Sequence, residues 1–251
     1  HEKLNFLSLF KRKLRYILKK KIKKDLENIE KLSLDDLFSY YDTDKANFIK
    51  SKNEPGHRFS KFYETHLNLF KEKKINILEI GSYSGAAAAA FVKYFPNSEI
   101  YCLDINLRNF KYSSKKIHPY GTDVSNTKMM LKFLSKINFD YIKYFDFIID
   151  DGLHIQSDQL IALNFFYKYV SNNGFYIIED YKFPNYFKHL NDVNDIKINE
   201  LIKKINNKET INSKLLSPET INDLLLNNKN IFEYKGNLDH SDIVFFEKTI
   251  S

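Results

Sequence analysis

Two apolar segments in the middle of the chain each end in acidic side chains. FDFIIDDGLH ends with Asp150, Asp151 and His154, and GFYIIEDY ends with Glu179 and Asp180. Each segment has the pattern of a buried strand, and the carboxyl ends of parallel strands meet at one edge of a sheet. Carboxylates brought together there repel one another unless a positive charge offsets them. A hard divalent cation such as Mg²⁺ or Ca²⁺ would do so, with Asp151, Glu179 and Asp180 as its expected ligands.

His154 follows Asp151 closely, on the same loop. An imidazole titrates near neutral pH, so it is suited to accept a proton from a reacting group. We therefore expect His154 to act as a general base, with Asp151 as its catalytic neighbour as well as a metal ligand. Three other interpretations stay open. His154 could be a nitrogen ligand of the metal or an ordinary loop histidine, and the acids could be solvated loop residues.

The earlier segment INILEIGSYSG has the pattern of a buried strand followed by a glycine turn. Gly81 and Gly85 allow the backbone to pass close to a ligand, and the helix that follows offers free N–H groups. The spacing G-x-x-x-G differs from G-x-G-x-x-G, which disfavours a nicotinamide dinucleotide. A plain turn between strand and helix would have the same sequence.

Two further acids end the next expected strands. Asp104 ends SEIYCLDI, where an acid can accept both ribose hydroxyls of a nucleoside, or instead cap the following helix. Asp123 follows a short third strand, where it could meet an adenine amino group. Its alternative role is to cap a helix that begins near Asn126. Together with the glycine turn, these positions favour a nucleoside site.

The surrounding pattern alternates strand and helix from about residue 75 onward. Short apolar strands separated by amphipathic helices predict βαβ units and a parallel sheet covered on both faces. We expect strands at 75–81, 98–105, 145–151 and 174–181, and helices at 86–95, 126–137 and 158–170. The runs 231–236 and 242–248 are joined by a turn-prone segment and predict an antiparallel hairpin. The predicted fold class is α/β, with a mostly parallel seven-stranded sheet and a helical N-terminal extension.

The formal net charge of +7 comes from lysines and arginines near the N-terminus, so it says little about the substrate. Residues 1–31 have the pattern of an amphipathic basic helix, which would pack on the protein or lie on an anionic membrane surface. Ser33 and Asp36 form an expected capping box. No apolar run is long enough to span a bilayer, and the N-terminus does not resemble a signal peptide. Cys102, the single cysteine, lies in a core strand pattern and is expected to be a buried thiol.

The strings ILEIGSYSG, EIYCLDI, FIIDDGLH and YIIEDY together resemble class I S-adenosylmethionine-dependent methyltransferases. More specifically, the chain is similar to metal-dependent sugar O-methyltransferases of the mycinamicin and macrocin type and their relatives in surface-polysaccharide gene clusters. That group carries YGTDK and then GHxYxxxYE, which correspond here to YDTDK at 41–45 and GHRFSKFYE at 56–64. Asp42 replaces the family glycine, Phe59 a tyrosine, and Leu153 the serine of DDGSH. The resemblance covers roughly residues 38–182, and these departures leave the metal ligands in place.

The resemblance implies a role for each matching residue. It implies that Asp151, Glu179 and Asp180 bind Mg²⁺, that His154 is the base, and that the 41–45 segment folds over the active site. Residues expected to contact S-adenosylmethionine are Glu79, Gly81, Ser82, Tyr83, Gly85, Asp104, Asp123 and Asp150. Residues expected to contact the substrate are Tyr41, Thr43, Asp44, Lys45, His57, Tyr63 and Tyr181.

The predicted function is methylation of a sugar hydroxyl by an S-adenosylmethionine- and Mg²⁺-dependent O-methyltransferase. By analogy the acceptor is a nucleotide-activated sugar, such as an NDP-hexose or NDP-heptose, used for capsule or surface polysaccharide. The expected domains are a basic N-terminal extension and lid, 1–70, and a methyltransferase domain, 71–251. We expect a cytoplasmic protein, and peripheral contact of the basic helix with the inner membrane is one alternative. We expect no nucleic-acid partner. The sequence leaves the oligomeric state open, with a homo-oligomer among the alternatives.

Two alternatives compete with this function. The basic charge would suit a methyltransferase acting on nucleic acid or protein, but the D/N-P-P-Y/F string of base-modifying enzymes is absent and the basic residues cluster at one end. A noncatalytic membrane-surface module built on the same fold is the second alternative. Retention of His154 and of the acids at 151, 179 and 180 argues against it.

Overall fold

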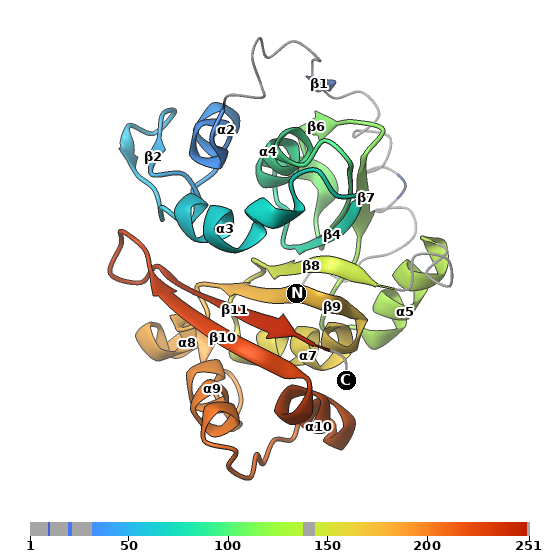
Figure 1. The fold of residues 1–251 in the computed structure, drawn as a ribbon, viewed down its shortest axis with the longest axis vertical. Coiled ribbons are helices and arrows are strands. Elements are labelled where there is room, and N and C mark those ends of the chain that lie inside the picture. The colour runs from blue at the N-terminus through green and yellow to red at the C-terminus, as the bar shows by residue number, and fades with distance from the viewer. Residues whose placement is uncertain (1–9, 11–19, 22–31, 138–143, 250–251) are drawn as a thin grey trace. The chain divides into compact units, whose positions relative to one another are not determined.

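A seven-stranded sheet, with the order β10-β11-β9-β8-β4-β5-β7, organises the chain (Figure 1). The computed structural model describes residues 10, 20–21, 32–137 and 144–249. β4 (Ile75–Ile80), β5 (Ser98–Asp104) and β7 (Ile117–Gly121) pair in parallel, as do β8 (Phe145–Asp150) and β9 (Val170–Glu179). β11 (Asp242–Lys248) pairs antiparallel with β9 and with β10 (Asn228–Lys235). The predicted sheet and its C-terminal hairpin are therefore confirmed.

The chain forms two compact units, and the first comprises residues 1–123 and 236–239. Here α2 (Leu34–Tyr41) packs against α3 (Ser60–Leu67) and α4 (Ala86–Tyr94), and α4 contacts β5 and β7. The small β2 (Phe48–Ile49) and β3 (Glu54–Pro55) form a separate hairpin. Five consecutive alanines begin α4 and all are buried, because their small side chains allow the helix to pack closely.

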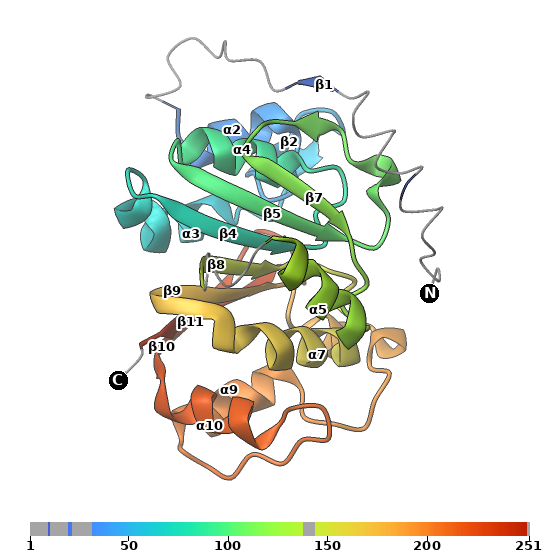
Figure 2. The same ribbon diagram turned by 90° about the vertical axis from the view of Figure 1, so that its right-hand side faces the viewer.

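The second unit comprises residues 124–235 and 240–251. α7 (Gln156–Phe166) packs against β8, β9 and α9 (Ile198–Asn206), and Figure 2 shows these elements together. The unit also contains α5 (Thr127–Lys136), the short α8 (Phe183–Tyr186) and α10 (Pro218–Leu226). The central residues of β8, β9 and β11 are almost entirely buried apolar side chains, as expected for strands covered on both faces. These strands deliver the acids at positions 150, 151, 179 and 180.

The N-terminal predictions are only partly covered by the described residues. The capping box is confirmed, because the Ser33 side chain accepts from the Asp36 N–H while the Asp36 side chain accepts from the Ser33 N–H. Of the helix expected over 1–31, Phe10 is helical, whereas Lys20–Lys21 form β1, which pairs with β6 (Tyr112–Ser113). The rest of that helix lies outside the described residues. In the described part of the chain, no helix is both long enough and apolar enough to cross a membrane.

Asp242 anchors α8 to the C-terminal hairpin. Its buried carboxylate accepts from Lys182 Nζ at 3.1 Å, from Tyr186 Oη at 2.7 Å and from Lys235 Nζ at 3.0 Å. Burial alone would raise the pKa of Asp242, but these donors outweigh burial and lower it. The segment that follows the acids of β9 is thereby fixed by an ionised side chain of β11.

We predict that Asp242→Asn lowers the free energy of unfolding by about 1–3 kcal/mol at pH 7, because two lysines lose their buried partner. A lowered folded pKa stabilises the protein above the ordinary value of 3.8, and this contribution is lost as the pH falls through the folded pKa. The difference in Tm between the variant and the wild type should therefore shrink below about pH 4. Thermal unfolding from pH 3 to pH 7 measures it. Glu54→Gln, which removes an exposed pair with Lys52, is the control and should change Tm little at any pH. A pH-independent loss in Asp242→Asn would contradict the assignment.

Candidate functional site

A tight turn of left-handed backbone joins β4 to α4. Gly81 has φ 84° and Gly85 has φ 72°, and Tyr83 between them also has a positive φ of 39°. The Gly81 N–H donates to the Leu103 carbonyl at 2.7 Å, and the Gly85 N–H donates to the Ser82 carbonyl at 2.6 Å. Few residues other than glycine adopt such backbone easily, so the two glycines are required by the shape of the turn.

Asp104, at the end of β5, holds this turn in place. One carboxylate oxygen accepts from the Tyr83 N–H at 2.8 Å, and the other accepts from the Asn106 N–H at 2.6 Å. Asp104 is partly exposed, and each of its oxygens has a second lone pair. It can therefore accept further hydrogen bonds from a ligand while it orders the loop. Tyr83, whose N–H it binds, is exposed, with 64% of the residue's surface accessible.

The other residues predicted for the nucleoside site surround the same strand ends. Glu79 is buried in β4, where the Cys102 thiol lies 3.9 Å from one of its carboxylate oxygens. Cys102 is itself fully buried, as expected, and burial raises the pKa of its thiol well above the ordinary value. The Ser82 hydroxyl donates to the Glu79 carbonyl at 3.2 Å. Asp123 ends this unit and is partly exposed, while Asn126 is the residue that caps α5.

The second group lies at the carboxyl ends of β8 and β9. His154 Nε2 lies 3.8 Å from an Asp151 carboxylate oxygen and 4.0 Å from an Asp180 carboxylate oxygen. Glu179, the last residue of β9, is buried like Asp180. The structure thus brings the predicted base next to two of the three predicted metal ligands. Within the described residues, no group of three His, Cys, Asp or Glu side chains is already arranged to hold a metal ion.

Asp150 contacts the backbone of the loop that carries His154. It is buried at the end of β8, and its Oδ1 accepts from the Gly152 N–H at 3.3 Å. Burial raises its pKa to about 8, although the Gly152 hydrogen bond acts in the opposite direction. Asp150 was expected to contact the cofactor. The contact that the structure shows is with the backbone of the loop that carries His154.

An aromatic side chain that sequence analysis missed lies beside the imidazole. The ring of Phe183 is 4.8 Å from the ring of His154, and Phe183 also contacts the ring of His240 at 5.3 Å. Both aromatic partners are partly exposed. Phe183 follows the EDY motif, but nothing in its spacing pointed to a contact with His154. Tyr181, predicted to touch substrate, is buried and its hydroxyl donates to Glu233.

The segment predicted to cover the site forms a network of its own in the first unit. The His57 N–H donates to the Asp44 carbonyl at 2.7 Å, and the Lys45 N–H donates to the Thr43 hydroxyl at 3.3 Å. The charges of Lys45, His57 and Lys52 lower the pKa of Asp44, which is exposed. The segment is therefore an ordered loop with a mixed charge. Tyr41 is the last residue of α2, and burial raises its pKa to about 12.

Tyr63 takes a packing role. It is fully buried, and its ring lies 6.1 Å from Phe38 and 5.5 Å from Phe91, in edge-on contacts that join α2, α3 and α4. The motif placed Tyr63 among the substrate contacts, whereas the structure surrounds it with core side chains. Lys45 is buried as well, with 2% of its surface exposed.

We predict that Gly85→Ala destabilises the turn. A Cβ at this position would lie 2.5 Å from Cζ of Phe110, which is itself buried, and φ would remain left-handed. The expected loss in the free energy of unfolding is about 1–3 kcal/mol, measured by thermal and chemical denaturation. Ser84→Ala, one residue earlier, is the control and should leave stability unchanged. Equal stability of both variants would show that the turn tolerates a side chain at position 85.

Several known proteins are similar to this chain in sequence. No family model matches the chain. Mycinamicin VI 2''-O-methyltransferase of Micromonospora griseorubida is 28% identical over 157 residues, which are 60% of this chain and 36% of that protein. L-olivosyl-oleandolide 3-O-methyltransferase of Streptomyces antibioticus is 29% identical over 156 residues, 59% of this chain and 36% of that protein. The matched region therefore spans about a third of the length of these curated relatives.

A solved structure of MycE methyltransferase from the mycinamycin biosynthetic pathway, in complex with Mg, SAH and mycinamycin VI, has a similar fold. The TM-score is 0.64 at 22% identity, and the match covers 87% of this chain and 55% of that chain. A second crystal form with Mg and SAH gives the same TM-score of 0.64. This chain therefore has the Rossmann-like α/β fold of class I methyltransferases.

Proposed function

We propose that the chain is an S-adenosylmethionine- and Mg²⁺-dependent O-methyltransferase that acts on a sugar hydroxyl. The observation that carries the proposal is the imidazole of His154, placed 3.8 Å from Asp151 and 4.0 Å from Asp180 at the ends of neighbouring parallel strands. A base beside paired carboxylates suits proton removal from a hydroxyl. The relatives named above are sugar O-methyltransferases, which supports a sugar hydroxyl as the acceptor.

The chemistry of the acidic donor set fits a hard cation. Asp151, Glu179 and Asp180 offer only carboxylate oxygens, the ligands that Mg²⁺ prefers, and two of them are buried. A bound cation would offset the negative charge that these three side chains carry when ionised. Bound to these three residues, the cation would polarise an acceptor oxygen and so ease loss of its proton.

The residues of the first unit are proposed to bind the cofactor. S-adenosylmethionine supplies a methyl group that is already activated by the sulfonium charge. Asp104, which ends β5 and is partly exposed, would accept from the ribose hydroxyls. The glycine turn brings the backbone close to the ligand without an intervening side chain, and Glu79, Ser82 and Asp123 lie at the same strand ends.

The residues of the second unit are proposed to activate the acceptor. His154 Nε2 would accept the hydroxyl proton, and the neighbouring carboxylates of Asp151 and Asp180 would stabilise the resulting imidazolium. The Phe183 ring packs against the imidazole, with 4.8 Å between the ring centroids.

The finer assignment concerns the form of the sugar. We propose a nucleotide-activated sugar of capsule or surface-polysaccharide synthesis. Lys52, His57 and Arg58 belong to one segment of the first unit and are not buried. Cationic groups of this kind suit a diphosphate linker.

A screen of acceptors tests this function. With S-adenosylmethionine and Mg²⁺, we expect a mass gain of one methyl group on at least one nucleotide-activated sugar, measured by mass spectrometry. Chelation with EDTA should abolish transfer, and added Mg²⁺ should restore it. Free sugars and glycosylated macrolides form the comparison arms. Transfer only to a glycosylated macrolide would overturn the nucleotide-linked acceptor, and transfer to no sugar would overturn the function itself.

We predict that His154→Gln lowers kcat by about 10²–10⁴-fold, the usual contribution of a general base. Affinity for S-adenosylhomocysteine, measured by calorimetry, should change little because the proposed nucleoside contacts lie in the first unit. His189→Gln is the matched control, since His189 is an exposed histidine of the same unit. Undiminished turnover in His154→Gln would remove His154 from the role of base.

A further inference from the structure

His154 occupies a backbone conformation that its neighbours must stabilise. Its φ of 54° lies in the sparsely populated left-handed region, and such residues persist when the surrounding structure fixes them. On the N-terminal side, the Gly152 N–H donates to Asp150 at 3.3 Å. On the C-terminal side, α7 begins at Gln156, and its N-cap residue Ile155 provides no side-chain cap. The restraint on that side must come from elsewhere in the chain.

Gln156 provides one such restraint. Its side chain is buried, with 1% of the residue exposed, and Nε2 donates to the Asp195 carbonyl at 2.7 Å and to the Ile196 carbonyl at 3.3 Å. One amide thus donates to two carbonyl groups about forty residues away, of which that of Ile196 is in a buried bond and that of Asp195 in a part-buried one. The first residue of α7 is thereby held on a segment far from it in sequence.

Asp192 supplies the missing helix cap from the same segment. Its Oδ1 accepts from the Ser157 N–H at 3.0 Å, and its Oδ2 accepts from the Ser157 hydroxyl at 2.6 Å. A cap normally comes from the residue that precedes the helix, and here a distant carboxylate takes its place. Its negative charge also suits the positive end of the α7 dipole.

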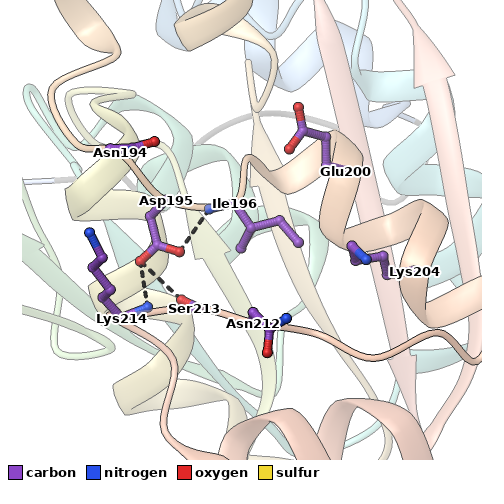
Figure 3. A pocket seen from close by; sticks show the side chains of 8 residues that line it. All are labelled: Asn194, Asp195, Ile196, Glu200, Lys204, Asn212, Ser213 and Lys214. Carbon is purple, nitrogen blue, oxygen red and sulfur yellow. Dashed lines mark hydrogen bonds between the residues drawn. The ribbon is translucent and has the colours of Figure 1, made fainter.

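The bracing segment is itself anchored. Figure 3 shows Asp195 with hydrogen bonds to Ile196, Ser213 and Lys214, in a cavity wall of the second unit. The Asp195 carboxylate accepts from Ser213 Oγ at 3.1 Å, from the Lys214 N–H at 2.8 Å and from the Leu215 N–H at 3.0 Å. Side-chain and backbone donors from a third segment therefore fix the residues that hold Gln156.

We infer that Gln156 is a positioning residue that holds the His154 imidazole against Asp151 and Asp180 through its bonds to 195–196, with Asp192 as its partner at the start of α7. The inference deepens the proposed function and rests on His154 being the base. It assigns a task to residues 192–196, which include none of the predicted site residues. A shift of about 1 Å in a catalytic group can cost two orders of magnitude in rate.

Gln159 offers a matched control within the same helix. It is as deeply buried as Gln156, with 2% exposed, but neither its Oε1 nor its Nε2 has a hydrogen-bond partner in the described part of the chain. Replacing Gln159 by leucine removes no bond to 195–196, whereas Gln156→Leu removes both. The two variants have the same change of volume and polarity.

Comparison of Gln156→Leu with Gln159→Leu tests the inference. We expect kcat to fall about ten- to a hundredfold in Gln156→Leu, with KM for acceptor and cofactor nearly unchanged, while Gln159→Leu keeps both. The imidazole resonances of His154, assigned by their loss in His154→Gln, should shift in Gln156→Leu and stay in Gln159→Leu. Equal kcat and equal His154 resonances in the two leucine variants would overturn the inference.

A second pair covers the case in which Gln156→Leu does not fold. Asp192→Ala removes the cap of α7, and Ser217→Ala removes the cap of α10, where Ser217 accepts from the Thr220 N–H. Both should lower Tm to a similar extent, but only Asp192→Ala should lower kcat and shift the His154 resonances. Parallel effects of the two alanine variants would overturn the inference. If the wild type methylates no sugar, the proposed function fails, and the resonances still decide whether Gln156 and Asp192 position His154.

Discussion

Burial of acidic side chains at the ends of β8 and β9 is the constraint on which the second unit depends. Glu179 and Asp180 are both buried, and Asp151 joins Asp180 within 4.0 Å of one imidazole nitrogen. Charges held in this way cost free energy unless their surroundings offset them. The backbone at these strand ends is also strained, because His154 and Asp180 have positive φ values of 54° and 49°. Strained conformations of this kind are typical of sites where geometry is kept for function.

The first unit meets a related demand in a different way. The turn between β4 and α4 also has left-handed backbone, but two of its three positive φ values belong to glycines, and Asp104 accepts from the N–H of the third residue, Tyr83, at 2.8 Å. A carboxylate that bonds backbone on one side can accept from a ligand on the other. The two units thus share a principle: an acid at a strand end orders the loop that would contact the ligand.

The strand ends could be predicted from sequence because both signals there are local. Apolar runs such as FDFIID predict buried strands, and acids directly after them must emerge at one edge. Contacts between distant segments left no such signal. Phe183 lies against His154 and Tyr63 packs on Phe91, and no residue spacing in the sequence predicts either contact. The pairing of Lys20–Lys21 with Tyr112–Ser113 is also a contact between distant segments. It could not be predicted, because the sequence around Lys20–Lys21 has a helical pattern.

The position of His154 is set largely by residues outside the stretch that resembles the methyltransferase family. On one side, Asp242 of β11 binds Lys182 and Tyr186 and so fixes α8, whose Phe183 packs on the imidazole. On the other side, Gln156 and Ser157 are held by 192–196. The motif therefore contains the proposed reacting groups, whereas the contacts that restrain the His154 loop come from the C-terminal third. Relatives that keep the motif but differ in this third would have to position the imidazole by other contacts, because a histidine with positive φ does not hold itself in place.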